Sequence, residues 1–101
     1  MATQVQVLVL YEQYGTMCLA VKYVEGTPHL VGGARDPQET TQECAIRVLF
    51  DDLGLGCQLH TLNYLGNKVL AIRIQETVYL DEIAIYLLKV SSQPTLKRNT
   101  A

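Results

Sequence analysis

Residues 32–55 read GGARDPQETTQECAIRVLFDDLGL, in which a glycine pair and a short loop lead into a run with helical periodicity. Large apolar residues recur in this run at three- and four-residue spacing, which is typical of one buried helical face. Thr40 and Glu43 have the spacing of a capping box, in which each side chain accepts a hydrogen bond from an unpaired backbone N–H. Gly54 is a typical helix stop. The sequence therefore predicts a helix from about Thr40 to Leu53.

Both flanks of this helix are rich in β-branched residues, which favour strands. We expect strands over residues 5–11, 17–24, 29–31, 58–65, 68–74 and 83–90, with a turn at Gly66-Asn67. The apolar run 83–88 is typical of a strand buried on both faces, although a short buried helix has the same pattern. We expect one domain over residues 1–90 and a flexible tail over 91–101. The expected fold class is α+β, a mixed sheet with one main helix and no clear C-terminal helix.

Composition narrows the class of protein. The chain has 101 residues, a net charge of −2 and 49% apolar residues, and no basic run precedes Lys97-Arg98. This argues for one small globular domain and against a dedicated nucleic-acid binder. Three cysteines without CxxC spacing argue against a disulfide framework or a zinc site. No signal peptide or membrane span is recognisable, so we expect a cytoplasmic protein.

Residues 33–55 resemble a degenerate Nudix box, the signature of the Nudix hydrolase family. The family pattern is Gly, five residues, Glu, seven residues, then Arg-Glu-apolar-x-Glu-Glu-x-Gly-apolar. The positions that match without a gap are Gly33, Glu39, Arg47, Leu49, Asp51, Asp52, Gly54 and Leu55. The resemblance implies a minimal α/β/α sandwich and the cleavage of a nucleoside diphosphate linked to another moiety. It also implies Mg²⁺ as the cofactor, with Mn²⁺ as the alternative, in metal-assisted substitution at phosphorus.

The resemblance implies roles for six residues. Asp51 and Asp52 correspond to metal ligands, and Glu39 to a supporting ligand or an anchor of the loop. Arg47 orients Glu39, and these four form the expected catalytic set. The glycines of the pair, Gly32 and Gly33, let the backbone approach the diphosphate of the substrate.

Three departures from the family pattern bear on catalysis. Val48 stands where the family has a Glu, on the same helical face as Asp52. Asp51 and Asp52 are each one methylene shorter than the usual Glu, and Gln38 replaces a usual Gly. Glu43 is a candidate replacement for the missing ligand, although its capping role is the simpler interpretation. The two aspartates have an alternative interpretation as solvated helix residues.

Other residues are weaker candidates. His29 and His60 have no partner at ligand spacing, and Cys44 lies beside the apolar stripe of the helix, where packing is the simpler role. Tyrosines in or near strands are candidates for stacking a base, although such residues are usually half-buried structure. These tyrosines are Tyr14, Tyr64 and Tyr79.

Two main hypotheses follow. The first is a Mg²⁺-dependent pyrophosphohydrolase of the Nudix type with reduced or altered activity. The alternative, motivated by Val48, is a non-catalytic Nudix-fold module that binds a nucleotide or a protein partner, such as an enzyme that it inhibits. An uncovered sheet face would favour a homodimer or another protein partner. A nucleic acid is expected as a ligand only in the form of a capped RNA end.

Overall fold

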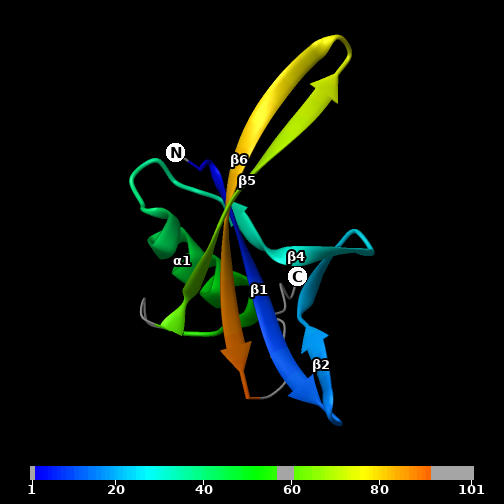
Figure 1. Cartoon of the computed structure of the whole chain (residues 1–101), viewed down its shortest axis with the longest axis vertical. Coiled ribbons are helices and arrows are strands. Elements are labelled where there is room, and N and C mark those ends of the chain that lie inside the picture. Colours follow the sequence, from blue (N-terminus) through cyan, green and yellow to red (C-terminus); the bar gives the residue numbers. More distant parts are fainter. Residues whose placement is uncertain (1, 57–60, 92–101) are drawn as a thin grey trace.

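The computed structural model of the chain describes residues 2–56 and 61–91. Six strands and one helix form in these ranges (Figure 1). Their bounds are β1 Gln4–Gln13, β2 Thr16–Leu19, β3 Val21–Val24, β4 Thr27–Ala34, α1 Thr41–Leu53, β5 Asn63–Ile74 and β6 Thr77–Val90. His60, Cys57 and the expected tail from residue 92 onward lie outside the described residues.

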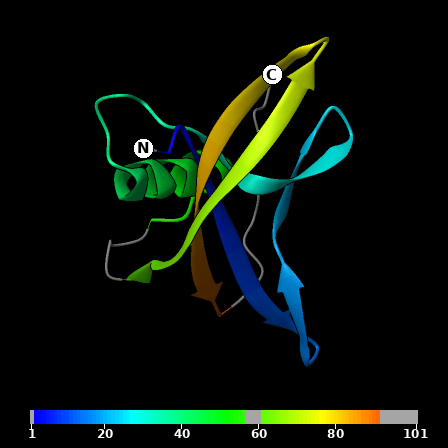
Figure 2. The ribbon, with the colours of Figure 1, turned by 45° about the horizontal axis from the view of Figure 1, so that its top comes forward.

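The strands form one mixed sheet in the order β3-β4-β1-β6-β5, with β2 paired to β1. The central pair, β1 and β6, is parallel, and the other pairs are antiparallel. Figures 1 and 2 show a strongly twisted sheet with α1 packed against one side. This confirms the expected α+β class and the mixed sheet with a single main helix. In the described part of the chain no helix is long and apolar enough to cross a membrane.

The core lies between α1 and the middle of the sheet. Alternate residues of β1 and β6 face the helix in register, because successive side chains of a strand point to opposite faces. The paired residues are Val5 with Ala84, Val7 with Tyr86, and Val9 with Leu88. They pack with Ala45, Val48 and Leu49 of α1 in one buried cluster. Burial of each large side chain contributes roughly 1.5–3 kcal/mol, so the helix is fixed firmly on the sheet.

Both ends of α1 follow the sequence prediction. The Thr40 hydroxyl accepts a hydrogen bond from the Glu43 backbone N–H at 3.1 Å, and the Glu43 carboxylate accepts one from the Thr40 N–H at 2.9 Å. Gly54 ends the helix in the left-handed conformation with φ 67°, which costs glycine little. The capping box therefore fixes where the helix begins, and Glu43 is engaged in it.

Three strand predictions were wrong in detail. Residues 17–24 split into β2 and β3 around Ala20, because the chain changes there from pairing with β1 to pairing with β4. The expected turn at Gly66-Asn67 is a β-bulge, and β5 continues through it. Gly66 has φ 134° there. The actual turn is at Gln75-Glu76, and β6 begins at Thr77 instead of residue 83.

The far half of the β5–β6 hairpin, residues 67–82, projects from the body of the protein, and we call it the arm. In Figures 1 and 2 it is the pair of yellow and yellow-green strands that extends beyond β1. The register with β1 starts only at Ile83, so the arm is a two-stranded ribbon.

Candidate functional site

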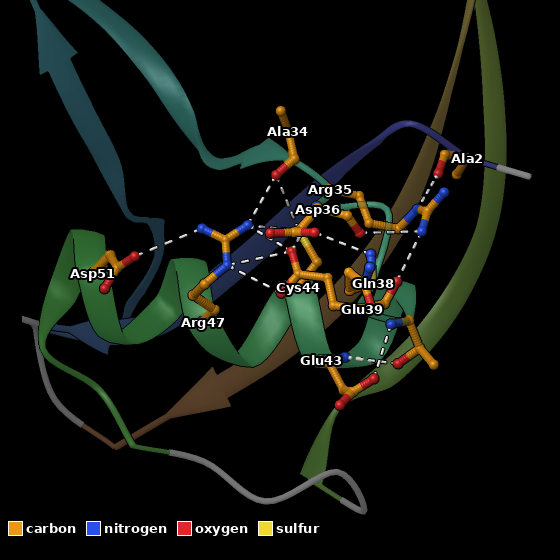
Figure 3. A network of polar contacts seen from close by, with 11 residues as sticks. Ala2, Ala34, Arg35, Asp36, Gln38, Glu39, Glu43, Cys44, Arg47 and Asp51 are labelled. Carbon is orange, nitrogen blue, oxygen red and sulfur yellow. Dashed lines mark hydrogen bonds and ion pairs between the residues drawn. The ribbon is translucent and has the colours of Figure 1, made fainter.

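The loop between β4 and α1 is held by its own polar groups (Figure 3). Arg35 donates from Nε to the Ala2 carbonyl at 2.7 Å and from Nη1 to the Glu39 carbonyl at 2.8 Å. The Asp36 carboxylate accepts from the Gln38 N–H at 3.0 Å. The loop therefore enters the helix in one defined conformation, and the side chain of Glu39 is directed back over α1.

Glu39 and Arg47 form the strongest ion pair of this region. Arg47 Nη2 lies 2.6 Å from Glu39 Oε1, and Nε donates to Oε2 at 3.1 Å. The same Nη2 donates to the Ala34 carbonyl at 2.9 Å, and the Asp36 N–H donates to Glu39 at 2.9 Å. The Arg47 guanidinium, followed by the Asp36 N–H, lowers the pKa of Glu39 to about 2. Glu39 in turn raises the pKa of Arg47. Both carboxylate oxygens of Glu39 are thus engaged in joining loop and helix.

Asp52 has a cation partner that the sequence pattern did not reveal. Lys22 of β3 reaches across the site, and its Nζ lies 2.9 Å from Asp52 Oδ2 and 2.8 Å from the Gly32 carbonyl oxygen. The side chains are 26% and 20% exposed. Lys22 lies outside the box on a strand of four residues, and no sequence spacing connects it to the helix. The ammonium therefore occupies the point where two hard oxygens converge.

Val48 fills the position of the missing family Glu with apolar packing. Its side chain is buried in the helix–sheet core, and a Cβ on Gly33 would lie 3.3 Å from Val48 Cγ1. A Cβ on Gly32 would lie 2.2 Å from the Val5 carbonyl oxygen, which is sterically impossible without a backbone shift. The glycine pair thus has a packing role, because it allows β4 to approach both β1 and α1 closely.

Asp51 is largely exposed to solvent and faces Arg47 (Figure 3). Its side chain is 56% exposed, and one oxygen lies 3.7 Å from Arg47 Nη1. Each of the three expected metal-binding carboxylates, on Glu39, Asp51 and Asp52, is therefore paired with Arg47 or Lys22. Within residues 2–56 and 61–91, no three Asp, Glu, His or Cys residues converge as a metal site would require. In these ion pairs, the carboxylates of Glu39, Asp51 and Asp52 do not fit a divalent cation.

The other candidate residues lie elsewhere. Cys44 is buried, and burial is the main cause that raises its pKa to about 11, so it carries a thiol and not a reactive thiolate. His29 is exposed on β4, Tyr14 is 95% exposed at a turn, and Tyr79 lies on the arm.

Tyr64 lies at the opposite end of α1 from Asp52. Its ring centroid is 5.4 Å from that of Tyr86, whose hydroxyl lies 2.7 Å from Thr41 Oγ1. These residues line an open pocket of about 350 Å³ together with Ala2, Gln42 and Asn67. The pocket combines an exposed aromatic ring with amide and hydroxyl groups, which is the composition that suits a flat polar ligand.

No family model and no curated protein sequence matches this chain. Solved structures resemble it in fold. A MutT/nudix family protein from Enterococcus faecalis is 14% identical with a TM-score of 0.74, over 93% of this chain and 38% of that one. The NUDIX domain of Shewanella oneidensis NrtR, solved with ADP ribose, is 14% identical with a TM-score of 0.72, over 99% of this chain and 66% of that one.

A third protein, MERS1 of T. brucei, has been solved with GDP and with RNA. Its GDP complex is 14% identical to this chain with a TM-score of 0.72, over 93% of this chain and 34% of that one. The RNA complex has a TM-score of 0.71. This chain spans between a third and two-thirds of the length of these proteins. The likeness shows that the chain has a Nudix fold.

Proposed function

We propose that this protein is a Nudix-fold module that binds a nucleotide derivative without hydrolysing it and without a divalent metal. The observation that carries the proposal is the position of Lys22 Nζ between the Gly32 carbonyl and Asp52. A protein ammonium there supplies the positive charge that a metal would otherwise supply. This is the alternative of the two functions that the sequence suggests, and the paired carboxylates favour it over the hydrolase.

Hydrolysis at phosphorus needs metal-bound oxygens or a free base next to the attacking water. Glu39 has a pKa of about 2 and engages both oxygens with Arg47, so it is a poor base at neutral pH. Asp52 is paired with Lys22, and Val48 has no ionisable group. Asp51 is solvent-exposed at the margin of the site. These pairings support binding without hydrolysis.

Two observations support a nucleotide derivative as the ligand class. Proteins of the same fold have been solved with ADP ribose and with GDP. In this chain, the pocket beside Tyr64 offers an exposed ring on which a base can stack, and Gln42 supplies an amide at its rim. Stacking of a base on an aromatic side chain contributes about 1–3 kcal/mol. The affinity would thus come mainly from the base, since the Lys22 ammonium is already engaged by Asp52 and by the Gly32 carbonyl.

Calorimetric titration with ADP ribose and with GDP, in EDTA and then in Mg²⁺, tests the proposal. We expect binding of one of them with the same Kd in both conditions. Tyr64→Ala should weaken that binding about tenfold or more. Tyr14→Ala is the matched control, because Tyr14 is 95% exposed at a distant turn and should leave the Kd unchanged.

A turnover assay distinguishes this proposal from the hydrolase. The substrates are nucleoside triphosphates, sugar nucleotides, dinucleoside polyphosphates and capped RNA, each with Mg²⁺ or Mn²⁺. We expect no turnover of any of them. Metal-dependent turnover that Asp52→Ala abolishes would establish the hydrolase and overturn the proposal.

A further inference from the structure

The arm exposes apolar side chains on both of its faces. Directly opposed residues of an antiparallel pair share a face, so Ile72 and Tyr79 lie on one face, and Ala71 and Leu80 on the other. Ile74 and Leu80 are 60% and 71% exposed. A two-stranded ribbon of this kind is at best marginally stable in water by itself. The arm therefore has the composition of a surface that is buried in an assembly.

Within the part of the chain that the structure describes, the outer edge of β5 carries unpaired ladder groups. The Thr3 N–H donates to the Glu82 carbonyl at 3.0 Å, so the backbone groups of Glu82 point away from β5. Val69 is directly opposite Glu82, and opposed residues of an antiparallel pair both point inward or both outward. By alternation, Val69, Ala71 and Arg73 direct their N–H and C=O groups to the open edge. Among the strands that the structure describes, β6 is the only partner of β5.

One antiparallel register of this edge with a second copy brings opposite charges together. A two-fold axis at Ile72 sets Ile72 against Ile72 and Leu70 against Ile74 of a second copy. It also sets Lys68 against Glu76 of the second copy, twice by symmetry. The outward-pointing groups of Ala71 then meet those of Arg73, as a ladder requires. By contrast, an axis at Arg73 or at Lys68 would bring like charges together.

We propose that two copies of this chain associate through antiparallel pairing of their β5 strands about an axis at Ile72. The pairing extends both sheets into one and sets the Ile72 side chains of the two copies next to each other on one face. It is an isologous contact, which closes at two copies and leaves no further edge of β5 open. The surface differs from the uncovered sheet face that the sequence suggested, because the arm projects beyond the body of the sheet.

Light scattering after size-exclusion chromatography, at micromolar concentrations, should give twice the chain mass of 11.3 kDa. Ala71→Pro should give a monomer, because it removes an N–H that points to the open edge without removing a hydrogen bond within the hairpin. Ala71→Thr keeps that N–H and is the matched control, which should remain a dimer. A wild-type monomer at every concentration would overturn the proposal. The arm would then be a surface for a protein other than a second copy of this chain.

Charge reversal tests the identity of the partner. Lys68→Glu and Glu76→Lys should each raise the dimer Kd on the order of tenfold, because two symmetry-related pairs become repulsive. The double variant carrying both substitutions should restore the dimer. Failure of that restoration, with both single variants impaired, would overturn the proposed register.

Disulfide trapping then locates the axis. With Cys18 and Cys57 replaced by Ser, Ile72→Cys should form a covalent dimer on oxidation, since the two substituted positions face each other directly. Val69→Cys is the control, because its two copies would be roughly 20 Å apart along the strands. Trapping at position 69 and not at 72 would overturn the proposal. Nucleotide titration of the Ala71→Pro variant is independent of this result, so the two proposals fail separately.

Discussion

The ammonium of Lys22, on β3, lies 2.9 Å from a carboxylate oxygen of Asp52, on α1, although 30 positions separate the two residues in the chain. The same ammonium also donates a hydrogen bond to the Gly32 carbonyl oxygen at 2.8 Å. The strand β3 is thereby connected to α1 through the ion pair of Lys22 and Asp52. Since β3 is an edge strand of the sheet, this contact holds a peripheral strand over the candidate site.

A double-mutant cycle should measure this connection. Lys22→Met and Asp52→Asn, alone and combined, should give a coupling energy of about 1 kcal/mol in urea unfolding, because both side chains are only partly exposed. Lys89→Met, at an exposed position of β6, serves as the control and should show no coupling to Asp52→Asn. A coupling energy of zero for Lys22 and Asp52 would mean that the pair does not stabilise the contact between β3 and α1.

Divalent metal should leave the wild-type protein unaffected. We expect the same Tm in EDTA and in millimolar Mg²⁺, because the Lys22 ammonium already binds the oxygens of Asp52 and Gly32 that converge there. The double variant Lys22→Met, Val48→Glu removes that ammonium and adds a carboxylate on the helical face of Asp52. Its Tm should rise by a few degrees with Mg²⁺ or Mn²⁺, since binding to the folded state stabilises it.

Two further Tm measurements, on the single variant and in EDTA, are controls for this interpretation. Lys22→Met alone keeps Val48 and should respond to Mg²⁺ less than the double variant does. Because Val48 is buried, the carboxylate introduced there is costly in the absence of metal, and the double variant should have the lowest Tm in EDTA. Stabilisation of the wild-type protein by Mg²⁺ would show that the carboxylates do bind a metal.

The sequence predicted local features better than long-range ones. The helix bounds followed from Thr40, Glu43 and Gly54, because capping interactions involve neighbours in the chain. Gly66 was wrongly predicted as a turn, because glycine serves turns and β-bulges equally and only the pairing of β5 with β6 distinguishes them. The turn at Gln75-Glu76 contains neither Gly nor Pro, so nothing in the sequence indicated it.

The candidate site was predictable only in part for the same reason. The spacing of Glu39 and Arg47 in the box was visible in the sequence, and the structure places the two side chains in contact. The role of Lys22 could not be predicted from the sequence, since its contact with Asp52 depends on how β3 pairs with β4. The consequence for function came from this residue, because it pairs with Asp52, while Arg47 already pairs with Glu39 and Asp51.

Acid should destabilise the protein through Glu39. The pKa of Glu39 is about 2 in the folded protein, against an ordinary value of 4.5 for a glutamate. The folded protein therefore favours the ionised carboxylate over the protonated acid. This contribution to stability is fully present above pH 4.5 and is lost as the pH falls from 4.5 to 2. Urea unfolding at a series of pH values should show this decline in the free energy of unfolding. The Glu39→Gln variant should be less stable than wild type at pH 7, and its free energy of unfolding should change less between pH 4.5 and pH 2.

Salt provides an independent check on the same pair. The Arg47 side chain is 43% exposed, so screening should reduce the difference between wild type and Glu39→Gln as the ionic strength rises. Glu12→Gln is a control, since Glu12 is an exposed carboxylate of β1 and should leave the pH profile unchanged. An identical acid profile in wild type and Glu39→Gln would exclude Glu39 as the group responsible.

The two glycines that precede the loop should differ sharply in their tolerance of a methyl group. At Gly32 a Cβ would lie 2.2 Å from the Val5 carbonyl oxygen, so Gly32→Ala forces β4 away from β1 and should cost about 3 kcal/mol or more. At Gly33 the contact is 3.3 Å from a Val48 methyl, which can move, and Gly33→Ala should cost about 1 kcal/mol. Urea unfolding measures both changes. The combination of Gly33→Ala with Val48→Ala should cost less than the sum of the single changes, because the smaller side chain leaves room for the added methyl. Strict additivity would show that the two residues do not pack together. It would also overturn the interpretation that Val48 has a packing role in place of a carboxylate.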